Sequence, residues 1–147
     1  MADIQRTADA VWQGDLRSGK GTISTPSGVL KEDAYSFVTR FEDQPGTNPE
    51  ELIAAAHAAC FSMAFSSALG KQGYTPESLS THATLTMVRA DAGMTVDRVR
   101  LEVVGRVPNI DEATFRQIAE EAEKGCPISR LLRPGLREVE VVASLKA

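Results

Sequence analysis

The 147-residue sequence predicts one α+β domain, residues 1–147. Segments with strand-like composition lie on both sides of a long helical segment that contains no charged residue. A second helical segment, with one apolar face, separates the later strands. No repeat, low-complexity tract or linker divides the chain, so we expect its elements in the order β-β-β-α-β-β-α-β.

The first part of the chain carries the signals of a small sheet. Strand-like residues at 11–12, 22–25 and 29–30 are separated by glycines and by a Pro-Ser-Gly turn at 26–28. In residues 35–41 (YSFVTRF) aromatic residues alternate with other side chains, which predicts a third strand. Arg40 would then lie on the face opposite the aromatic rings.

A long helix is predicted next. Asn48 suits the N-cap, Pro49 suits the first helical position, and the acidic residues that follow favour the positive end of the helix dipole. The helix should run to Leu69, with Gly70 ending it.

Residues 52–69 of this helix carry no charge, and apolar or small side chains fall on every side, so the helix must be buried almost all round. A chain of this length has difficulty covering an apolar helix of about 30 Å by itself. We therefore expect a second copy of the chain to supply the missing cover. A membrane-spanning helix is disfavoured, because the run is rich in alanine and contains His57, Cys60 and several serines.

The rest of the chain alternates strands and helices. Two strands are expected at 81–89 and 98–107, and a closing strand at 139–145. Asp111 should cap an amphipathic helix that Gly125 ends, and Cys126 and Pro127 form a second helix start.

Composition narrows the functional classes. The chain has 42% apolar residues, 16 basic against 20 acidic residues and a net charge of −4, without the basic stripe that a nucleic acid requires. The N-terminal residues do not have the pattern of a secretory signal, so we expect a cytoplasmic protein. There the two cysteines, which lack both a C-x-x-C and a zinc-finger spacing, are either buried thiols or reactive groups.

Two cysteine positions have reactive potential. Cys126 precedes a helix start whose N–H groups and dipole could stabilise a thiolate. Cys60 lies on the buried helix, where burial raises the pKa of a thiol unless a cation is near. Arg40 is the best candidate for that cation, and Glu50 or Glu51 is the nearest carboxylate that could orient it.

Helix geometry limits how these groups can meet. Glu50 and Cys60 are ten positions apart on one helix, which is roughly 15 Å, so they cannot share a site within one chain. If two copies pack these helices antiparallel, the Glu50 end of one chain approaches Cys60 of the other. This predicts a site at a dimer interface.

Simpler interpretations exist for the same residues. Composition alone favours Cys60 as a small core residue. His57 could be a general base or metal ligand, but a hydrogen-bonded structural histidine is the more common case. Two cysteines and two histidines without short ligand spacing do not predict a metal site.

Several motifs together resemble a known family. They are residues 12–15 (WQGD), 19–21 (GKG), 39–41 (TRF), 47–52 (TNPEEL), 55–64 (AAHAACFSMA) and 125–129 (GCPIS). In this order and spacing they resemble the osmotically inducible protein C and organic hydroperoxide resistance family, nearer to the osmotically inducible branch.

The resemblance implies an intertwined homodimer in which antiparallel sheets built from both chains enclose two long central helices. It also implies a stress-response peroxidase without cofactor or metal, which reduces organic hydroperoxides and is regenerated by a dithiol of the dihydrolipoyl type. Cys60 would be the peroxidatic thiolate, Arg40 and Glu50 its activating pair, and Cys126 the resolving thiol that closes a Cys60–Cys126 disulfide. Neither nucleic acid nor membrane is implied.

Two other functions remain open from the residues alone. A cysteine hydrolase could use Cys60 with His57, and it would need an oxyanion hole but not Cys126. A non-catalytic stress-response or ligand-binding dimer would have inert thiols, with a Cys60 pKa of about 8.5 or higher.

Overall fold

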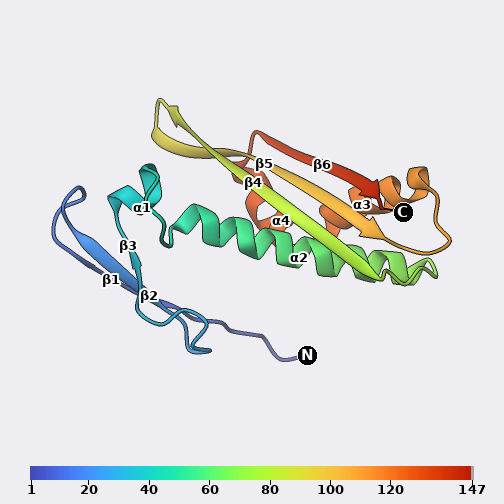
Figure 1. Cartoon of the computed structure of the whole chain (residues 1–147), viewed down its shortest axis with the longest axis horizontal. Helices are drawn as coiled ribbons and strands as arrows, with labels where there is room; N and C mark the ends of the chain where they lie inside the picture. Colours follow the sequence, from blue (N-terminus) through green and yellow to red (C-terminus); the bar gives the residue numbers. More distant parts are fainter. Residues whose placement is uncertain (147) are drawn as a thin grey trace. The chain divides into compact units, whose positions relative to one another are not determined.

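The computed structural model describes residues 1–146, which form two compact units. The first unit is Met1–Leu52 and the second begins at Ile53. Figure 1 shows the elements of both units in chain order, coloured from blue to red.

A three-stranded antiparallel sheet forms most of the first unit. Its strands are β1 (Asp9–Gln13), β2 (Lys20–Ser24) and β3 (Asp33–Tyr35), in the order β1-β2-β3. The rings of Trp12 on β1 and Tyr35 on β3 lie 5.5 Å apart across β2. Gly21 on β2 leaves the space under the Tyr35 ring that any larger residue would fill.

The predicted strand at residues 35–41 is wrong. β3 ends at Tyr35, and Phe37–Phe41 forms the short helix α1. Ser36 caps this helix: its hydroxyl accepts from the Thr39 N–H at 3.4 Å, and the Thr39 hydroxyl accepts from the Ser36 N–H at 2.9 Å. This reciprocal pair satisfies two backbone donors at the helix start, so the cap overrides the alternation of aromatic residues.

Helix α1 also changes the surroundings of Arg40. Its guanidinium carbon lies 5.0 Å from the centre of the Phe41 ring, so Arg40 does not face away from the aromatic residues as predicted. A guanidinium over an aromatic face is a favourable cation–π arrangement.

The second unit contains a mixed sheet, a long helix and two further helices. The strands are β4 (Ser78–Ala90), β5 (Gly93–Arg106) and β6 (Glu138–Leu145), and the helices are α2 (Pro49–Lys71), which starts in the first unit, α3 (Glu112–Gly125) and α4 (Pro127–Leu132), followed by the short 3-10 helix η1 (Arg133–Gly135). The predicted α+β class is confirmed.

The sheet differs from the expectation in one pairing. β4 and β5 form an antiparallel hairpin, whereas β6 runs parallel to β5. The chain leaves β5, crosses over through α3 and α4, and returns in the same direction, which is the connection that a parallel pair requires. The sheet is therefore mixed and not purely antiparallel.

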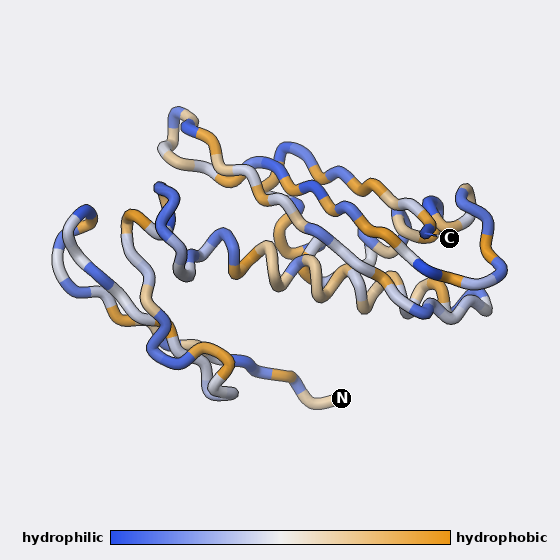
Figure 2. Tube along the Cα trace, in the orientation of Figure 1, coloured by the Kyte–Doolittle hydropathy of each residue, from blue (hydrophilic) through white to orange (hydrophobic). Residues whose placement is uncertain are grey.

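The core of the second unit lies between the sheet and its helices. Val99, Leu101 and Val103 alternate on the inner face of β5 and belong to one buried cluster with Phe65 of α2 and Phe115 of α3. The Phe65 and Phe115 rings lie 4.8 Å apart, where they join the two helices. In Figure 2 orange residues alternate with blue residues along these strands, as expected for a sheet with one buried face.

Helix α2 is only partly covered. It extends to Lys71, two residues past the predicted end, and buries His57, Phe61, Phe65 and Leu69. Much of its remaining surface is exposed and uncharged, with Met63 at 76% exposure. By length and composition α2 could cross a membrane, but core helices of soluble proteins have the same properties, and its buried face belongs to the core of the second unit.

Candidate functional site

The two cysteines lie on neighbouring elements of the second unit. Cys60 lies in the middle of α2. Cys126 is both the C-cap of α3 and the N-cap of α4, where its N–H donates to the Ala122 carbonyl at 2.8 Å and its carbonyl accepts from the Arg130 N–H at 2.9 Å. Both thiols are free; Cys60 is partly exposed and Cys126 is completely buried. Residue Cys60 is therefore partly open to solvent, whereas Cys126 is closed off.

The Cys60 sulfur has two close neighbours from the α4 region. Burial raises the pKa of the Cys60 thiol, a hydrogen bond from the backbone N–H of Ile128 lowers it, and the adjacent Cys126 thiol raises it again. The net direction is upward. The thiol form is therefore favoured by the surroundings that the second unit provides.

The backbone N–H of Ile128 lowers the pKa of a different cysteine from the one that the sequence analysis predicted. We expected the start of α4 to stabilise a thiolate on Cys126, but the N–H acts on Cys60. Pro127 at the first position of α4 has no N–H, and Ile128 next to it lies in the first turn, whose donors have no partner within the helix. In the sequence, Pro127 indicates the start of this helix. Which sulfur the Ile128 N–H faces cannot be predicted from the sequence, because it depends on how α4 packs against α2.

No cation contributes to the pKa shift of Cys60 among the described residues. A cation that lowers the pKa of Cys60 enough to form a thiolate must therefore come from residues other than the Ile128 and Cys126 neighbours described above.

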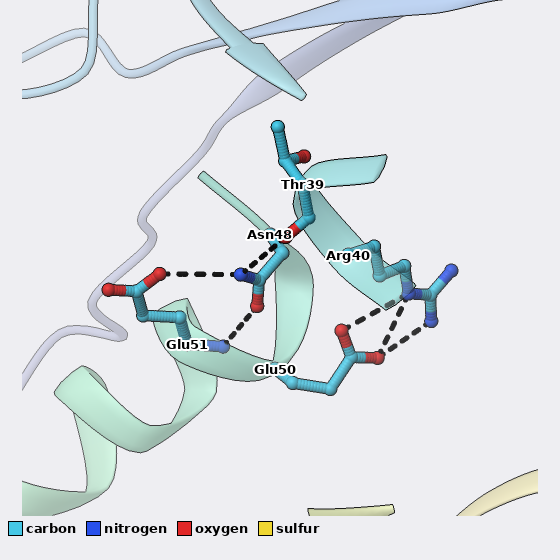
Figure 3. A network of polar contacts seen from close by, with 5 residues as sticks. All are labelled: Thr39, Arg40, Asn48, Glu50 and Glu51. Atoms are coloured by element: carbon cyan, nitrogen blue, oxygen red, sulfur yellow. Dashed lines mark hydrogen bonds and ion pairs between the residues drawn. The ribbon is translucent and has the colours of Figure 1, made fainter. Parts of the chain in front are cut away.

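Arg40 and Glu50 form an oriented ion pair in the first unit. Arg40 Nε donates to both Glu50 carboxylate oxygens at 3.1 Å, and Nη2 donates to Oε1 at 2.7 Å. Figure 3 shows the carboxylate facing one edge of the guanidinium. The Arg40 side chain is 37% exposed and that of Glu50 15%, so the pair retains a solvent-accessible cationic side.

Glu51, the other carboxylate considered for this role, has a different partner. Asn48 Nδ2 donates to Glu51 Oε2 at 3.3 Å, and the Glu51 N–H donates to Asn48 Oδ1 at 2.7 Å. Asn48 Nδ2 also donates to the Thr39 carbonyl at 3.2 Å. Asn48 thus caps α2 and ties its first turn to α1, which holds Arg40 and Glu50 in reach of each other (Figure 3).

A hollow of about 250 Å³ lies beside this ion pair within the first unit. Apart from Ser36 and Arg40, its lining is apolar or aromatic: Trp12, Leu16, Tyr35, Phe37 and Phe41. Arg40 therefore places a positive charge at the border of an apolar space.

His57 has the hydrogen bond expected of a structural histidine. Its Nε2 lies 2.6 Å from the Ser129 hydroxyl of α4, and both residues are completely buried. Burial lowers the pKa of His57, the nearby Glu123 carboxylate raises it and Arg133 lowers it. The neutral ring is therefore favoured. Within residues 1–146, no three His, Cys, Asp or Glu side chains gather closely enough to hold a metal ion.

Comparisons with known proteins identify the family of this chain. Residues 41–139 match the model of the OsmC-like protein family. The chain is 50% identical over 130 residues to the peroxiredoxin OsmC of Escherichia coli (strain K12), covering 88% of this chain and 91% of that protein. It is 29% identical over 119 residues to the organic hydroperoxide resistance protein OhrB of Bacillus subtilis (strain 168), covering 80% and 85%.

Solved structures share the fold. The crystal structure of Bacillus subtilis OhrB aligns with a TM-score of 0.70 at 26% identity, over 95% of this chain and 98% of that one. An OsmC-like protein from Mycoplasma pneumoniae aligns with a TM-score of 0.75 at 16% identity, over 99% and 100%. This chain therefore belongs to the OsmC-like family, is more similar to the peroxiredoxin OsmC than to the organic hydroperoxide resistance protein OhrB, and is a peroxidase-type oxidoreductase.

Proposed function

We propose that this protein reduces organic hydroperoxides to alcohols through Cys60 and Cys126, and that a dithiol regenerates it. The observation that carries the proposal is a pair of free thiols of unequal exposure, in which Cys60 packs against the core cluster that contains Cys126. In this proposal the partly exposed Cys60 reacts with the peroxide, and the buried Cys126 then reacts with oxidised Cys60. The names of the relatives, a peroxiredoxin and organic hydroperoxide resistance proteins, support the same chemistry.

The reaction has three steps. The Cys60 thiolate attacks the O–O bond of the hydroperoxide, so that the alkoxide leaves, takes up a proton as the alcohol, and Cys60 becomes a sulfenic acid. The Cys126 thiol then attacks the Cys60 sulfur, the S–O bond breaks, and water leaves as the disulfide forms. A dithiol, which we take to be of the dihydrolipoyl type, returns both cysteines to thiols by exchange.

Arg40 supplies the cation in this proposal, and Glu50 orients it. Lowering the pKa of a thiol by about two units is worth roughly 2.7 kcal/mol, which one guanidinium in a partly dry pocket can supply. Because Glu50 and Cys60 are roughly 15 Å apart along α2, we propose that Arg40 and Glu50 act on the Cys60 of a second copy in a homodimer.

The hollow beside Arg40 supports organic substrates. Its aromatic lining suits the alkyl or aryl part of a hydroperoxide, while the guanidinium at its border stabilises the negative charge that develops on the leaving oxygen. Hydrogen peroxide has no apolar part and gains nothing from such a lining. We place this activity in the cytoplasm, where dithiol reductants are available.

The test is consumption of cumene hydroperoxide in the presence of dihydrolipoamide by the wild type, Cys60→Ser and Cys126→Ser. We expect turnover and a 60–126 disulfide in the wild type and no reaction in Cys60→Ser. In a separate arm without dihydrolipoamide, Cys126→Ser should consume a single equivalent and stop as a sulfenic acid. Undiminished turnover by Cys60→Ser would refute the proposal. Absence of a 60–126 disulfide in the wild type oxidised without dihydrolipoamide would refute the role of Cys126.

A further inference from the structure

Three buried polar residues, His57, Ser129 and Glu123, lie in the second unit, which also carries the two cysteines. His57 of α2 bonds to Ser129 of α4 at 2.6 Å, and the Glu123 carboxylate of α3 pairs with Arg133 of η1 next to the histidine. His57 and Ser129 are completely buried, and Glu123 is 5% exposed. Buried polar groups cost free energy unless they are bonded, so this set needs a reason to exist in an otherwise apolar core.

The hydrogen bond between His57 and Ser129 joins a turn of α2 next to Cys60 to the first turn of α4, which follows Cys126. His57 lies one turn before Cys60 on α2, and Ser129 lies one turn after Cys126 at the start of α4. The Ile128 N–H that reaches the Cys60 sulfur comes from the same turn of α4. Among the described residues, His57 Nδ1 has no partner, so the ring directs its hydrogen bonding to Ser129.

We propose that His57 is a positioning residue: its bond to Ser129 holds the first turn of α4 against α2 so that the Cys126 sulfur can attack a Cys60 sulfenic acid. The inference rests on the proposed function, because it concerns the second step of that reaction. In that step the Cys126 thiol forms the S–S bond while the S–O bond of Cys60 breaks, and the leaving hydroxide takes the thiol proton to become water. The attacking sulfur must lie close to Cys60 and in line with the S–O bond.

Helix α4 depends on this bond more than a long helix would. It has only six residues, and Cys126 at its start makes no side-chain capping bond. Without the hydrogen bond between His57 and Ser129, the first turn of α4 can shift, and Cys126 shifts with it. The first step needs only Cys60 and the peroxide, so loss of this hydrogen bond should slow disulfide closure more than sulfenic acid formation.

The experiment compares four single variants and one double variant with the wild type. His57→Gln places an amide near the position of Nε2 and can still reach Ser129, whereas His57→Asn places it near Nδ1 and cannot. Ser129→Ala removes the other partner. Ser62→Ala is the matched control, because it removes a hydroxyl bond of 2.7 Å from the same helix, but to Thr81 of β4 and not to α4. Near-ultraviolet circular dichroism checks that each variant is folded.

Both steps are measured in single turnover with cumene hydroperoxide. Trapping with dimedone reports the sulfenic acid, and quenched mass spectrometry reports the disulfide. We expect His57→Asn and Ser129→Ala to close the disulfide about tenfold more slowly or worse, with sulfenic acid formation within about threefold of the wild type. His57→Gln and Ser62→Ala should close at close to the wild-type rate, and the double variant H57N/S129A should be no slower than either single variant.

A second oxidant separates this inference from the proposed function. Diamide, an azo compound, adds to the Cys60 thiolate, and Cys126 then displaces the hydrazine as the disulfide forms. If the wild type ignores the hydroperoxide but the variants keep the expected order with diamide, the inference stands and the proposed function falls. Closure at the wild-type rate in His57→Asn and Ser129→Ala overturns the inference. So does equal slowing in His57→Gln or Ser62→Ala, because the effect would then be general loosening.

Discussion

Cys60 experiences opposing influences at a single sulfur atom. Burial and the Cys126 thiol raise its pKa, and the Ile128 N–H lowers it without reversing the direction. A thiol in this state reacts slowly at neutral pH, because the thiolate is the nucleophile. In the proposed mechanism the activating cation decides the rate, so the role of the Arg40 orientation can be tested by a variant.

Replacing Glu50 with Gln removes the carboxylate that receives three hydrogen bonds from Arg40. We expect the second-order rate constant of Cys60 with cumene hydroperoxide to fall roughly 10–100-fold, because bonds to charged groups are worth about 1.5–3 kcal/mol. Stopped-flow measurement of the first turnover gives this constant. Glu51→Gln is the control, since Glu51 bonds to Asn48, and it should stay within about twofold. Equal losses in both variants would remove the special role of Glu50.

The lowered pKa of His57 predicts a pH dependence of stability. Burial favours the neutral ring in the folded state, so the unfolded state binds a proton more readily. Its contribution is fully present above the unfolded pKa of about 6.5 and is lost as the pH falls through the lower folded pKa. Urea denaturation at several pH values between about 7 and 5 should therefore show a smaller loss of unfolding free energy in His57→Gln than in the wild type. His82→Gln, at an exposed strand position, should keep the wild-type loss.

At the scale of residues, contacts between positions close in the sequence could be predicted, and contacts between distant positions could not. Glu50, ten positions from Arg40, was one of two carboxylates that the sequence put forward as its partner, and the structure pairs it with Arg40. The hydrogen bonds of Cys60 with Ile128 and of His57 with Ser129 join α2 to a segment far along the chain. Only the packing of α4 on α2 creates them, so no local pattern could indicate them. The catalytic roles of Cys60, Cys126, Arg40 and Glu50 remain predictions.

Among the elements, α1 shows how a short-range signal can mislead. The alternating aromatic residues at 35–41 fit a strand, but Ser36 and Thr39 cap a helix across the same residues. Phe37 and Phe41 then lie one turn apart with ring centres 5.0 Å from each other, so a helix places them on one face as well as a strand would. Periodicity over seven residues cannot separate the two cases.

Long elements were predicted well, because their signals are long. The uncharged run after Pro49 and the alternation in β5 each extend over many residues, and both elements are present. The parallel pairing of β6 with β5 was not predicted. Strand direction depends on where the crossover through α3 delivers the chain, which the composition of β6 does not encode.

The contact between α3 and β5 gives a prediction at this scale. A Cβ added at Gly105 would collide with the Phe115 ring, so Gly105→Ala should lower the unfolding free energy by about 1–3 kcal/mol through overpacking. Gly70, near the end of α2, has no atom within 4 Å of such a Cβ. Gly70→Ala should therefore raise the unfolding free energy by about 0.5–1 kcal/mol. Denaturation curves of both variants decide the matter, and equal effects would contradict the packing described here.

For the whole molecule, the uncovered surface of α2 is the feature that calls for a partner. Small uncharged residues and Met63 are exposed along it, although the helix has the composition of a core helix. Small side chains allow two helices to approach closely, and burying their shared surface would stabilise a pair of chains. The homodimer that the sequence predicts would provide this cover, and it remains a prediction.

Analytical ultracentrifugation tests the oligomeric state. We expect the 15.8 kDa chain to sediment at twice its mass, and Met63→Glu to shift it toward the monomer, because a buried unpaired carboxylate is costly. Val104→Glu is the control, since Val104 is also exposed but lies on the outer face of β5. Monomers with full peroxidase activity would contradict both the homodimer and a site formed by two copies.

The complete burial of Cys126 has a consequence for the reduction of the proposed Cys60–Cys126 disulfide. Because Cys60 is partly exposed and Cys126 is buried, we expect a reductant to bond first to Cys60, with Cys126 as the leaving thiolate. The second thiol of the reductant must then release Cys60 by attacking its own partner sulfur. A monothiol would form a mixed disulfide at Cys60 that only a second monothiol molecule could release, and Cys126 could displace the first monothiol before that happens. We therefore expect reductants that carry two thiols to be more effective.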